Sequence, residues 1–130
     1  MDEYFNLIQF PTINPPPSSL IHVDAQDELL DLYRRSGQKG MLAAHLKRRL
    51  MLLEERLHQA PVFKSDWFEI LEPPSNHLYA IRFLGAGTLG NLRIIYDIKG
   101  SNPRLLVAFQ EKNKSDYAPA IEAALNRSRD

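Results

Sequence analysis

Three basic side chains, Arg82, Arg93 and Lys112, lie on or just after successive apolar segments in the second half of the chain. Guanidinium and ammonium groups held on a rigid surface bind phosphate, and arginine does so through two parallel hydrogen bonds. Like charges placed directly opposite each other in a sheet are destabilising, so gathering them on one patch indicates a function. The sequence therefore predicts a site for a phosphate-bearing ligand. A simpler interpretation stays open, in which these are solvated cations that only protect a sheet edge.

The elements that position these cations are three short predicted strands, at 78–83, 91–96 and 104–109. Each is rich in β-branched, aromatic and leucine residues, and Gly/Asn/Pro clusters separate them. This pattern is typical of an antiparallel meander. Alternation along the strands assigns one set of side chains to a buried face. That set is Tyr79, Ile81, Phe83, Leu92, Ile94, Tyr96 and Ile98.

The turns set the register of the meander. A first turn centred near 87–88 puts Arg82 directly across from Arg93. A second turn centred near 101–102 puts Arg93 across from Gln110, with Lys112 one step diagonally away. The three cations and Gln110 are then expected on one face of the sheet.

The rest of the chain supplies helices and two further strands. We expect a strand at 19–23, a helix capped by Asp24 and stopped by Gly37, a helix at 39–60, and a strand at 66–71. A last helix follows Ser115 and ends near 129. The 39–60 helix has one apolar stripe, which consists of Leu42, Leu46, Leu50, Leu53 and Leu57.

This order predicts an α+β fold: a small antiparallel β-sheet with two N-terminal helices packed on one face and a short C-terminal helix. We expect the other face of the sheet to stay open and to carry the three cations. Residues 1–18 form a proline-rich N-terminal arm and residues 19–130 the domain. Within the arm, residues 4–10 fit either an edge strand or a loosely docked segment.

Composition narrows the class of protein. The chain has 130 residues, enough for one domain with its own core. It has no cysteine, which excludes a disulfide scaffold and a thiolate zinc site. No His/Asp/Glu cluster has ligand spacing, so we expect no metal site and no cofactor. No apolar run approaches the roughly 20 residues that span a bilayer, and no signal pattern opens the sequence, so we expect a cytoplasmic protein.

The charge is balanced overall but unevenly spread. Residues 1–31 carry six acidic and no basic side chains, whereas residues 34–56 carry seven basic and two acidic ones. Such asymmetry gives mild support to an anionic partner. Arg48 and Arg49 lie off the leucine stripe, where they could contact a nucleic-acid backbone. An ordinary solvated helix face is the alternative.

The order of these motifs resembles a known family. A strand and two helices precede Leu-Tyr-x-Ile-Arg at 78–82, then Leu-Arg-Ile-Ile-Tyr at 92–96, then Ala-Phe-x-x-Lys at 108–112. This is similar to the RelE/ParE superfamily of bacterial toxins, closest to its HigB-like, phage-associated branch. The resemblance covers about 19–130 and implies a RelE-like fold.

The resemblance implies a metal-independent, ribosome-dependent messenger-RNA endonuclease, a nuclease toxin of a toxin-antitoxin system. The expected partners are a cognate antitoxin, either a helix-turn-helix protein or an amphipathic helix, and the ribosome with its messenger RNA. Arg93 corresponds to the arginine that faces the scissile phosphate, Arg82 and Lys112 complete the basic set, and Tyr117 is the nearest match to a C-terminal aromatic. Gln110, Lys114, Arg48 and Arg49 are the expected RNA-binding residues.

Proton transfer needs another group, because arginine cannot act as a base at neutral pH. Lys112, Glu111, Tyr117 and His77 remain candidates. Two alternative functions also remain. One is a ParE-like inhibitor of DNA gyrase that performs no catalysis. The other is an inactive homologue that only binds a partner protein, which the acidic Glu111 and the neutral total charge favour.

Overall fold

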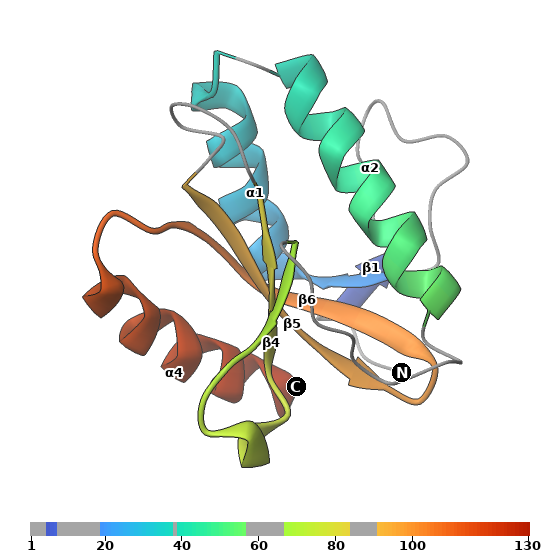
Figure 1. The fold of residues 1–130 in the computed structure, drawn as a ribbon, viewed down its shortest axis with the longest axis vertical. Helices are drawn as coiled ribbons and strands as arrows, with labels where there is room; N and C mark the ends of the chain where they lie inside the picture. Colours follow the sequence, from blue (N-terminus) through green and yellow to red (C-terminus); the bar gives the residue numbers. More distant parts are fainter. Residues whose placement is uncertain (1–4, 8–18, 38, 57–66, 84–90) are drawn as a thin grey trace.

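The computed structural model describes residues 5–7, 19–37, 39–56, 67–83 and 91–130. Figure 1 shows helices packed around one twisted sheet. The strands are β1 (Phe5–Leu7), β2 (Leu20–His22), β3 (Phe68–Ile70), β4 (Tyr79–Arg82), β5 (Leu92–Lys99) and β6 (Asn102–Gln110). The helices are α1 (Val23–Arg35), α2 (Lys39–Arg56) and α4 (Tyr117–Ser128), with short 3-10 helices at Pro74–Asn76 and Lys114–Asp116.

The predicted α+β class is confirmed, and the sheet has one feature that the sequence did not indicate. Its strands lie in the order β1-β2-β6-β5-β4-β3. All neighbours are antiparallel except β2 and β6, which run parallel. The sheet is therefore mixed, because the chain passes through both N-terminal helices and the meander before β6 returns beside β2. At the far edge, β1 is an edge strand, the first of the two structures expected for the arm.

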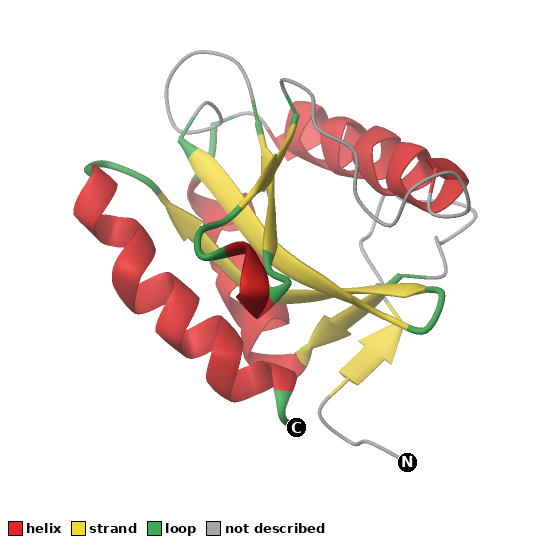
Figure 2. Ribbon diagram, turned by 60° about the horizontal axis from the view of Figure 1, so that its bottom comes forward, coloured by secondary structure: helices red, strands yellow, loops and turns green. Residues whose placement is uncertain are grey.

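Helices cover both faces of the sheet, so the expected open face is wrong. One core joins α1 and α2 to the sheet through residues such as Leu29, Leu46 and Ile94. A second core joins α4 to the opposite face through Ala120, Ala124 and Ile95. Figure 2 shows α4 on one side of the strands and the two N-terminal helices on the other. Alanines at the α4 contacts let this helix approach the sheet closely. The apolar stripe of α4 is short, so the sequence did not indicate that the helix covers this face.

The leucine stripe of α2 lies in the core, as predicted. Leu42, Leu46, Leu50 and Leu53 are all at most 1% exposed. The fifth leucine of the stripe, at 57, lies outside the described residues. On the sheet, Ile81, Phe83, Ile94 and Tyr96 face these helices, which confirms the predicted buried face.

The β5–β6 hairpin turns one residue earlier than expected. Lys99 pairs with Asn102, so Gly100 and Ser101 form the turn. Gly100 has a φ of 65°, a conformation typical of the first central residue of a type II′ hairpin. A register shift after Ile95 then moves the pairing by one residue. As a result Arg93 faces Phe109, and the predicted pairing of Arg93 with Gln110 is wrong.

Two helix starts also differ from the prediction. His22, not Asp24, caps α1: its side chain accepts a hydrogen bond from the Asp24 backbone N–H. The N-cap of α4 is Asp116 and not Ser115, and it makes no side-chain capping bond to α4. Asp116 instead forms a reciprocal capping box with Asn113 around the preceding 3-10 helix. No helix in the described part of the chain is long and apolar enough to span a bilayer.

Candidate active site

Arg82 and Arg93 lie directly across from each other, as the first predicted turn required. The turn itself falls outside the described residues. Arg82 is half-buried on β4, whereas Arg93 on β5 is buried, with 8% of its surface exposed. The exposed position expected for Arg93 is therefore wrong. Helix α4 packs over this face and removes solvent from it.

Burial of the Arg93 guanidinium requires compensation, and the residue after β6 supplies it. Nη2 of Arg93 lies 3.1 Å from Oε1 of Glu111. Nη1 donates a hydrogen bond to the carbonyl of Leu92 at 2.8 Å. A charge withdrawn from water is retained only when it is paired and hydrogen-bonded. Glu111, a residue expected near catalysis, is therefore the counter-ion of Arg93.

Tyr117 brings a phenol to the same end of the sheet from the first turn of α4. Its hydroxyl donates a hydrogen bond to Oε1 of Glu69 at 2.7 Å. Its ring packs edge-on against Phe109, with 5.3 Å between centroids. Burial, and then the hydrogen bond to Glu69, raise the pKa of Tyr117. The phenol therefore stays protonated at neutral pH.

These residues form one group, the sheet-end cluster: Glu69, Arg82, Arg93, Glu111 and Tyr117. They come from β3, β4, β5, the end of β6 and α4. The charges of Glu111 and Arg93 both act on the pKa of Tyr117, in opposite directions, so both lie within electrostatic range of the phenol. The cluster thus combines cationic groups for a phosphate with carboxylates and a phenol for proton transfer.

Sequence reasoning missed Glu69. Glu69 pairs with Ala80, which lies on the same face of β4 as Arg82, two residues later. The signal was a lone carboxylate inside the apolar strand β3. It could be placed only with the β3–β4 register, which the sequence does not define because no tight turn joins these strands.

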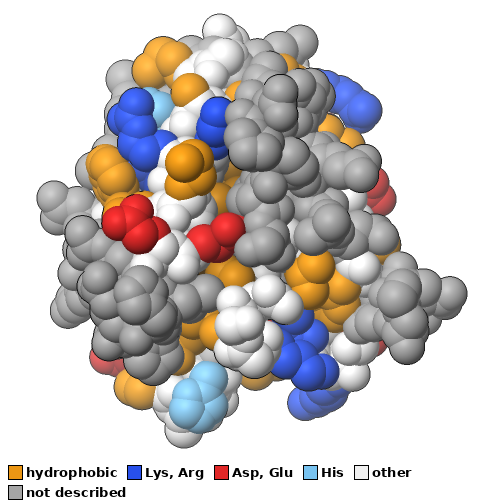
Figure 3. Space-filling view, turned by 90° about the vertical axis from the view of Figure 1, so that its right-hand side faces the viewer, with side chains coloured by type: hydrophobic (Ala, Val, Ile, Leu, Met, Phe, Trp, Pro, Cys, Tyr) orange, Lys and Arg blue, Asp and Glu red, His pale blue; other side chains and the backbone are white. Residues whose placement is uncertain are grey.

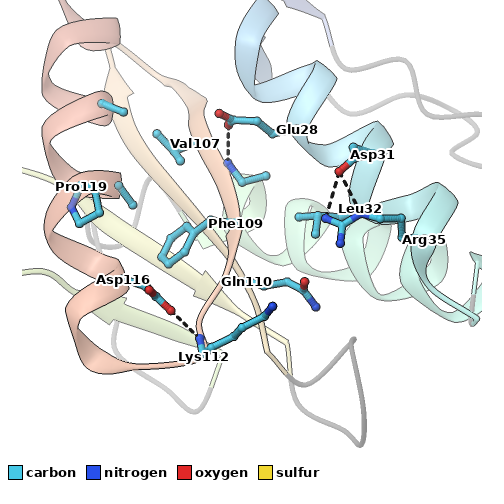
Figure 4. A pocket seen from close by; sticks show the side chains of 13 residues that line it. Glu28, Asp31, Leu32, Arg35, Val107, Phe109, Gln110, Lys112, Asp116 and Pro119 are labelled. Atoms are coloured by element: carbon cyan, nitrogen blue, oxygen red, sulfur yellow. Dashed lines mark hydrogen bonds and ion pairs between the residues drawn. The ribbon is translucent and has the colours of Figure 1, made fainter.

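Lys112 and Gln110 lie elsewhere, on a groove between α1 and α4. Figure 4 shows both side chains directed toward α1, whereas Phe109 points toward α4. The backbone N–H of Lys112 donates to Oδ2 of Asp116 at 2.7 Å. Hydrogen bonds from the Asn113 and Lys112 backbone lower the pKa of Asp116. Lys112 therefore follows the cluster in sequence, but its side chain lines a different surface.

The remaining candidates separate from the cluster. Lys114 is exposed on the 3-10 helix before α4. His77 is exposed and precedes the first residue of β4, whereas Arg82 is the last residue of that strand. The two residues therefore lie at different ends of β4. Arg48 is exposed on α2. Figure 3, which views the right-hand side of Figure 1, shows Lys and Arg side chains in separate groups with hydrophobic ones between them.

Arg49 is buried, so its expected position on a solvated helix face is wrong. Only 2% of its surface is exposed. Its guanidinium lies 4.4 Å from the ring centroid of Trp67 and 4.9 Å from that of Phe83. Nε donates to the carbonyl of Arg82 at 2.8 Å. Burial, and then the charge of Arg48, lower the pKa of Arg49 to about 10. Its role is to join α2 to the sheet.

No group of three or more His, Cys, Asp or Glu side chains in the described residues is arranged to hold a metal ion. Comparison with known proteins adds no identity: no protein-family model matches the chain, and no curated protein matches it. The geometry of the sheet-end cluster is therefore the basis on which a function is assigned.

Proposed function

We propose that the chain is a metal-independent endoribonuclease that cleaves messenger RNA on the ribosome, with the sheet-end cluster as its active site. The observation that supports this most is the placement of Arg82 and Arg93 side by side at a sheet end that also holds Glu69 and the Tyr117 phenol. The resemblance to RelE/ParE toxins points to the same chemistry. Such a toxin acts in the cytoplasm and is neutralised by a cognate antitoxin.

The reaction needs one proton to move between two oxygens. The ribose 2′-oxygen attacks the adjacent phosphorus, the bond from phosphorus to the 5′-oxygen breaks, and a 2′,3′-cyclic phosphate and a 5′-hydroxyl result. Glu69 accepts the proton of the 2′-hydroxyl, and Tyr117 gives its proton to the leaving 5′-oxygen. Glu69 then returns a proton to the Tyr117 phenolate, since the two groups are already hydrogen-bonded at 2.7 Å.

Arg93 stabilises the charge that develops on the phosphate. In the resting protein its guanidinium holds Glu111, so the phosphate must take the place of that carboxylate. Both are oxyanions that accept hydrogen bonds from the same guanidinium. Arg82, half-buried beside Arg93, adds a second cation to the phosphate site.

A second candidate is a protein-binding homologue without catalysis. The observation that favours it is the self-neutralised state of Arg93, which is buried and paired with Glu111. On this reading the ion pair only stabilises the end of the sheet. The two functions differ in whether Glu69 and Tyr117 affect a rate.

The experiment is induced expression of the wild type in a bacterium, followed by mapping of messenger-RNA ends. Tyr117→Phe is the test variant, and Lys99→Ala, on an exposed residue of β5 outside the cluster, is the matched control. We expect cuts in register with codons, a 2′,3′-cyclic phosphate end, and a loss of about 10²–10⁴ in rate for Tyr117→Phe only. Intact RNA with poisoned gyrase would indicate the ParE-like function. Absence of toxicity would indicate the protein-binding homologue.

A further inference from the structure

Among the described strands, only β2 pairs with the outer edge of β6, and it covers only part of that edge. β2 pairs with β6 at Arg104 and Leu105 and then ends, because the chain turns away into α1 at Val23. From Leu106 to Gln110 no described strand lies on this side of β6. An unpaired strand edge is a template for another extended chain.

Side chains from α1 and α4 form hydrogen bonds with the β6 backbone at the end of this edge that is nearest to β2. Ala108 donates its backbone N–H to Oε1 of Glu28 at 3.1 Å, and Arg127 donates to the carbonyl of Leu106 at 2.8 Å. The Ala108 N–H thus points outward, away from β5. By strand alternation the Ala108 carbonyl and the backbone N–H and carbonyl of Gln110 point outward too.

A groove lies along this edge. It has a volume of about 600 Å³, and α1 and α4 form its walls. Figure 4 shows the strand between the two helices, with Val107 and Phe109 directed toward α4. The α4 wall is apolar and is made by Pro119, Ala120 and Ala123. The α1 wall is mixed, because Leu32 lies there among charged residues.

We propose that this groove binds an extended segment of a partner protein, which pairs with β6 at the Ala108 carbonyl and at Gln110, beyond the backbone groups that Glu28 and Arg127 already occupy. Alternate side chains of such a strand point to opposite faces. Those on one face meet the apolar α4 wall, so the segment carries small or branched apolar residues at every second position. Those on the other face meet Gln110 and the exposed Lys112. The acidic lining residues already accept hydrogen bonds, Glu28 from Arg127, Asp31 from Arg35 and Asp116 from backbone N–H groups, so Lys112 favours an acidic residue of the segment there.

The walls favour a single strand over a second copy of this chain paired edge to edge. A second sheet would bring its own covering helices to the place where α1 and α4 already stand. A lone extended segment needs no such space. Its main chain pairs with β6, while its side chains fill the groove on both sides.

The test uses a phage-displayed library of random peptides of about nine residues, a length of roughly 30 Å when extended. The library is selected on the wild-type protein and counter-selected on Ala123→Arg, which fills the α4 wall. Ala118→Arg is the matched control, because Ala118 is exposed on α4 and lies outside the groove lining. Melting temperatures verify that both variants fold.

We expect the enriched peptides to alternate apolar and polar residues and to contain an acidic one. A synthetic copy should lose at least tenfold in affinity for Ala123→Arg and for Gln110→Pro, which removes an outward N–H, but not for Ala118→Arg. Slower exchange of the Gln110 amide on binding would support strand pairing. Equal affinity for a copy with N-methylated alternate amides, or no enrichment, would overturn the proposal. So would a dimer of the wild type that Ala123→Arg dissociates, since a second copy would then occupy the groove.

Discussion

Glu28 on α1 and Arg127 on α4 form a two-bonded ion pair across the edge of β6. Nη2 of Arg127 lies 2.8 Å from Oε2 of Glu28, and Nη1 lies 2.9 Å from Oε1. The hydrogen bond, and after it the charge of Glu28, raise the pKa of Arg127 against the opposing effect of burial. Because both residues also bond to the β6 backbone, the pair joins the helices from the two opposite layers to one strand.

We expect Glu28→Ala to lower the free energy of unfolding by about 1–2 kcal/mol, because it removes a charged acceptor from Arg127 and from the Ala108 N–H. Arg35→Ala is the control. It breaks the Arg35–Asp31 pair, in which both side chains are more than half exposed, and should change stability by under about 0.5 kcal/mol. Urea denaturation measures both. Equal losses would mean that the Glu28–Arg127 pair has no special role.

Removal of the hydroxyl group should change the free energy of unfolding in opposite directions at Tyr96 and at Tyr117. Tyr96 is fully buried, and its hydroxyl has no hydrogen-bond partner among the described residues. Tyr96→Phe should therefore raise the free energy of unfolding by about 1 kcal/mol. Tyr117→Phe should lower it by a similar amount, because it removes the bond to Glu69. Both variants are compared with the wild type by urea denaturation at pH 7. A lower free energy of unfolding for Tyr96→Phe would show that the Tyr96 hydroxyl has a hydrogen-bond partner.

The burial of Tyr96 also predicts that the protein loses stability in alkaline solution. Burial raises the pKa of Tyr96, and the neighbouring Tyr79 adds to the shift. A group whose pKa is higher in the folded state contributes its full stability below the pKa of the unfolded chain, about 10 for tyrosine. That contribution is lost as the pH rises from there toward the folded pKa. The urea midpoint of the wild type should therefore fall above pH 10, and the fall should be smaller in Tyr96→Phe.

The α2 stripe offers a test of the core. Leu50 is 0% exposed, whereas the adjacent Met51 is 55% exposed. Leu50→Ala should lower the free energy of unfolding by about 2–4 kcal/mol, through lost transfer energy and a residual cavity. Met51→Ala should change it by under about 0.5 kcal/mol. Similar losses for both would contradict the packing of α2 on the sheet.

The sequence predicted the parts of the fold that have strong local signals. The period of Leu42, Leu46, Leu50 and Leu53 identified α2 and its buried side, and alternation identified the core face of β4 and β5. Long-range choices were not predictable. The parallel pairing of β2 with β6 joins segments that are more than eighty residues apart in the sequence, and no local pattern predicts such a pairing.

The candidate site was predicted in part for the same reason. The Arg82–Arg93 pairing followed from a single hairpin register. The burial of Arg93 did not, because it depends on α4 packing against that face. The bulge after Ile95 redirected Gln110 toward α1, since one extra residue on β6 exchanges the two faces. The missed carboxylate, Glu69, needed a register between strands with no tight turn.

Glu111 and Glu69 should have opposite effects if the sheet-end cluster cleaves RNA. Glu111 is the resting counter-ion of Arg93, so Glu111→Gln removes the anion with which the phosphate competes. RNA should then bind more tightly at low salt, by roughly tenfold, without a loss in cleavage rate. Glu69 accepts the hydrogen bond of Tyr117, so Glu69→Gln removes the proton acceptor. Cleavage should fall by about 10²–10⁴ while RNA affinity stays near that of the wild type.

Arg93 itself is tested by Arg93→Lys, which keeps the positive charge opposite Glu111 but loses the two-bonded contact with phosphate. Arg93→Ala is the poorer choice, because it leaves the partly buried Glu111 carboxylate without its partner and so destabilises the fold by itself. We expect Arg93→Lys to cleave about 10²–10³ more slowly in single-turnover reactions on programmed ribosomes, with little change in melting temperature. The double variant Arg93→Gln/Glu111→Gln removes both charges at once and should be folded and inactive. If that double variant cleaves as fast as the wild type, the catalytic site lies elsewhere.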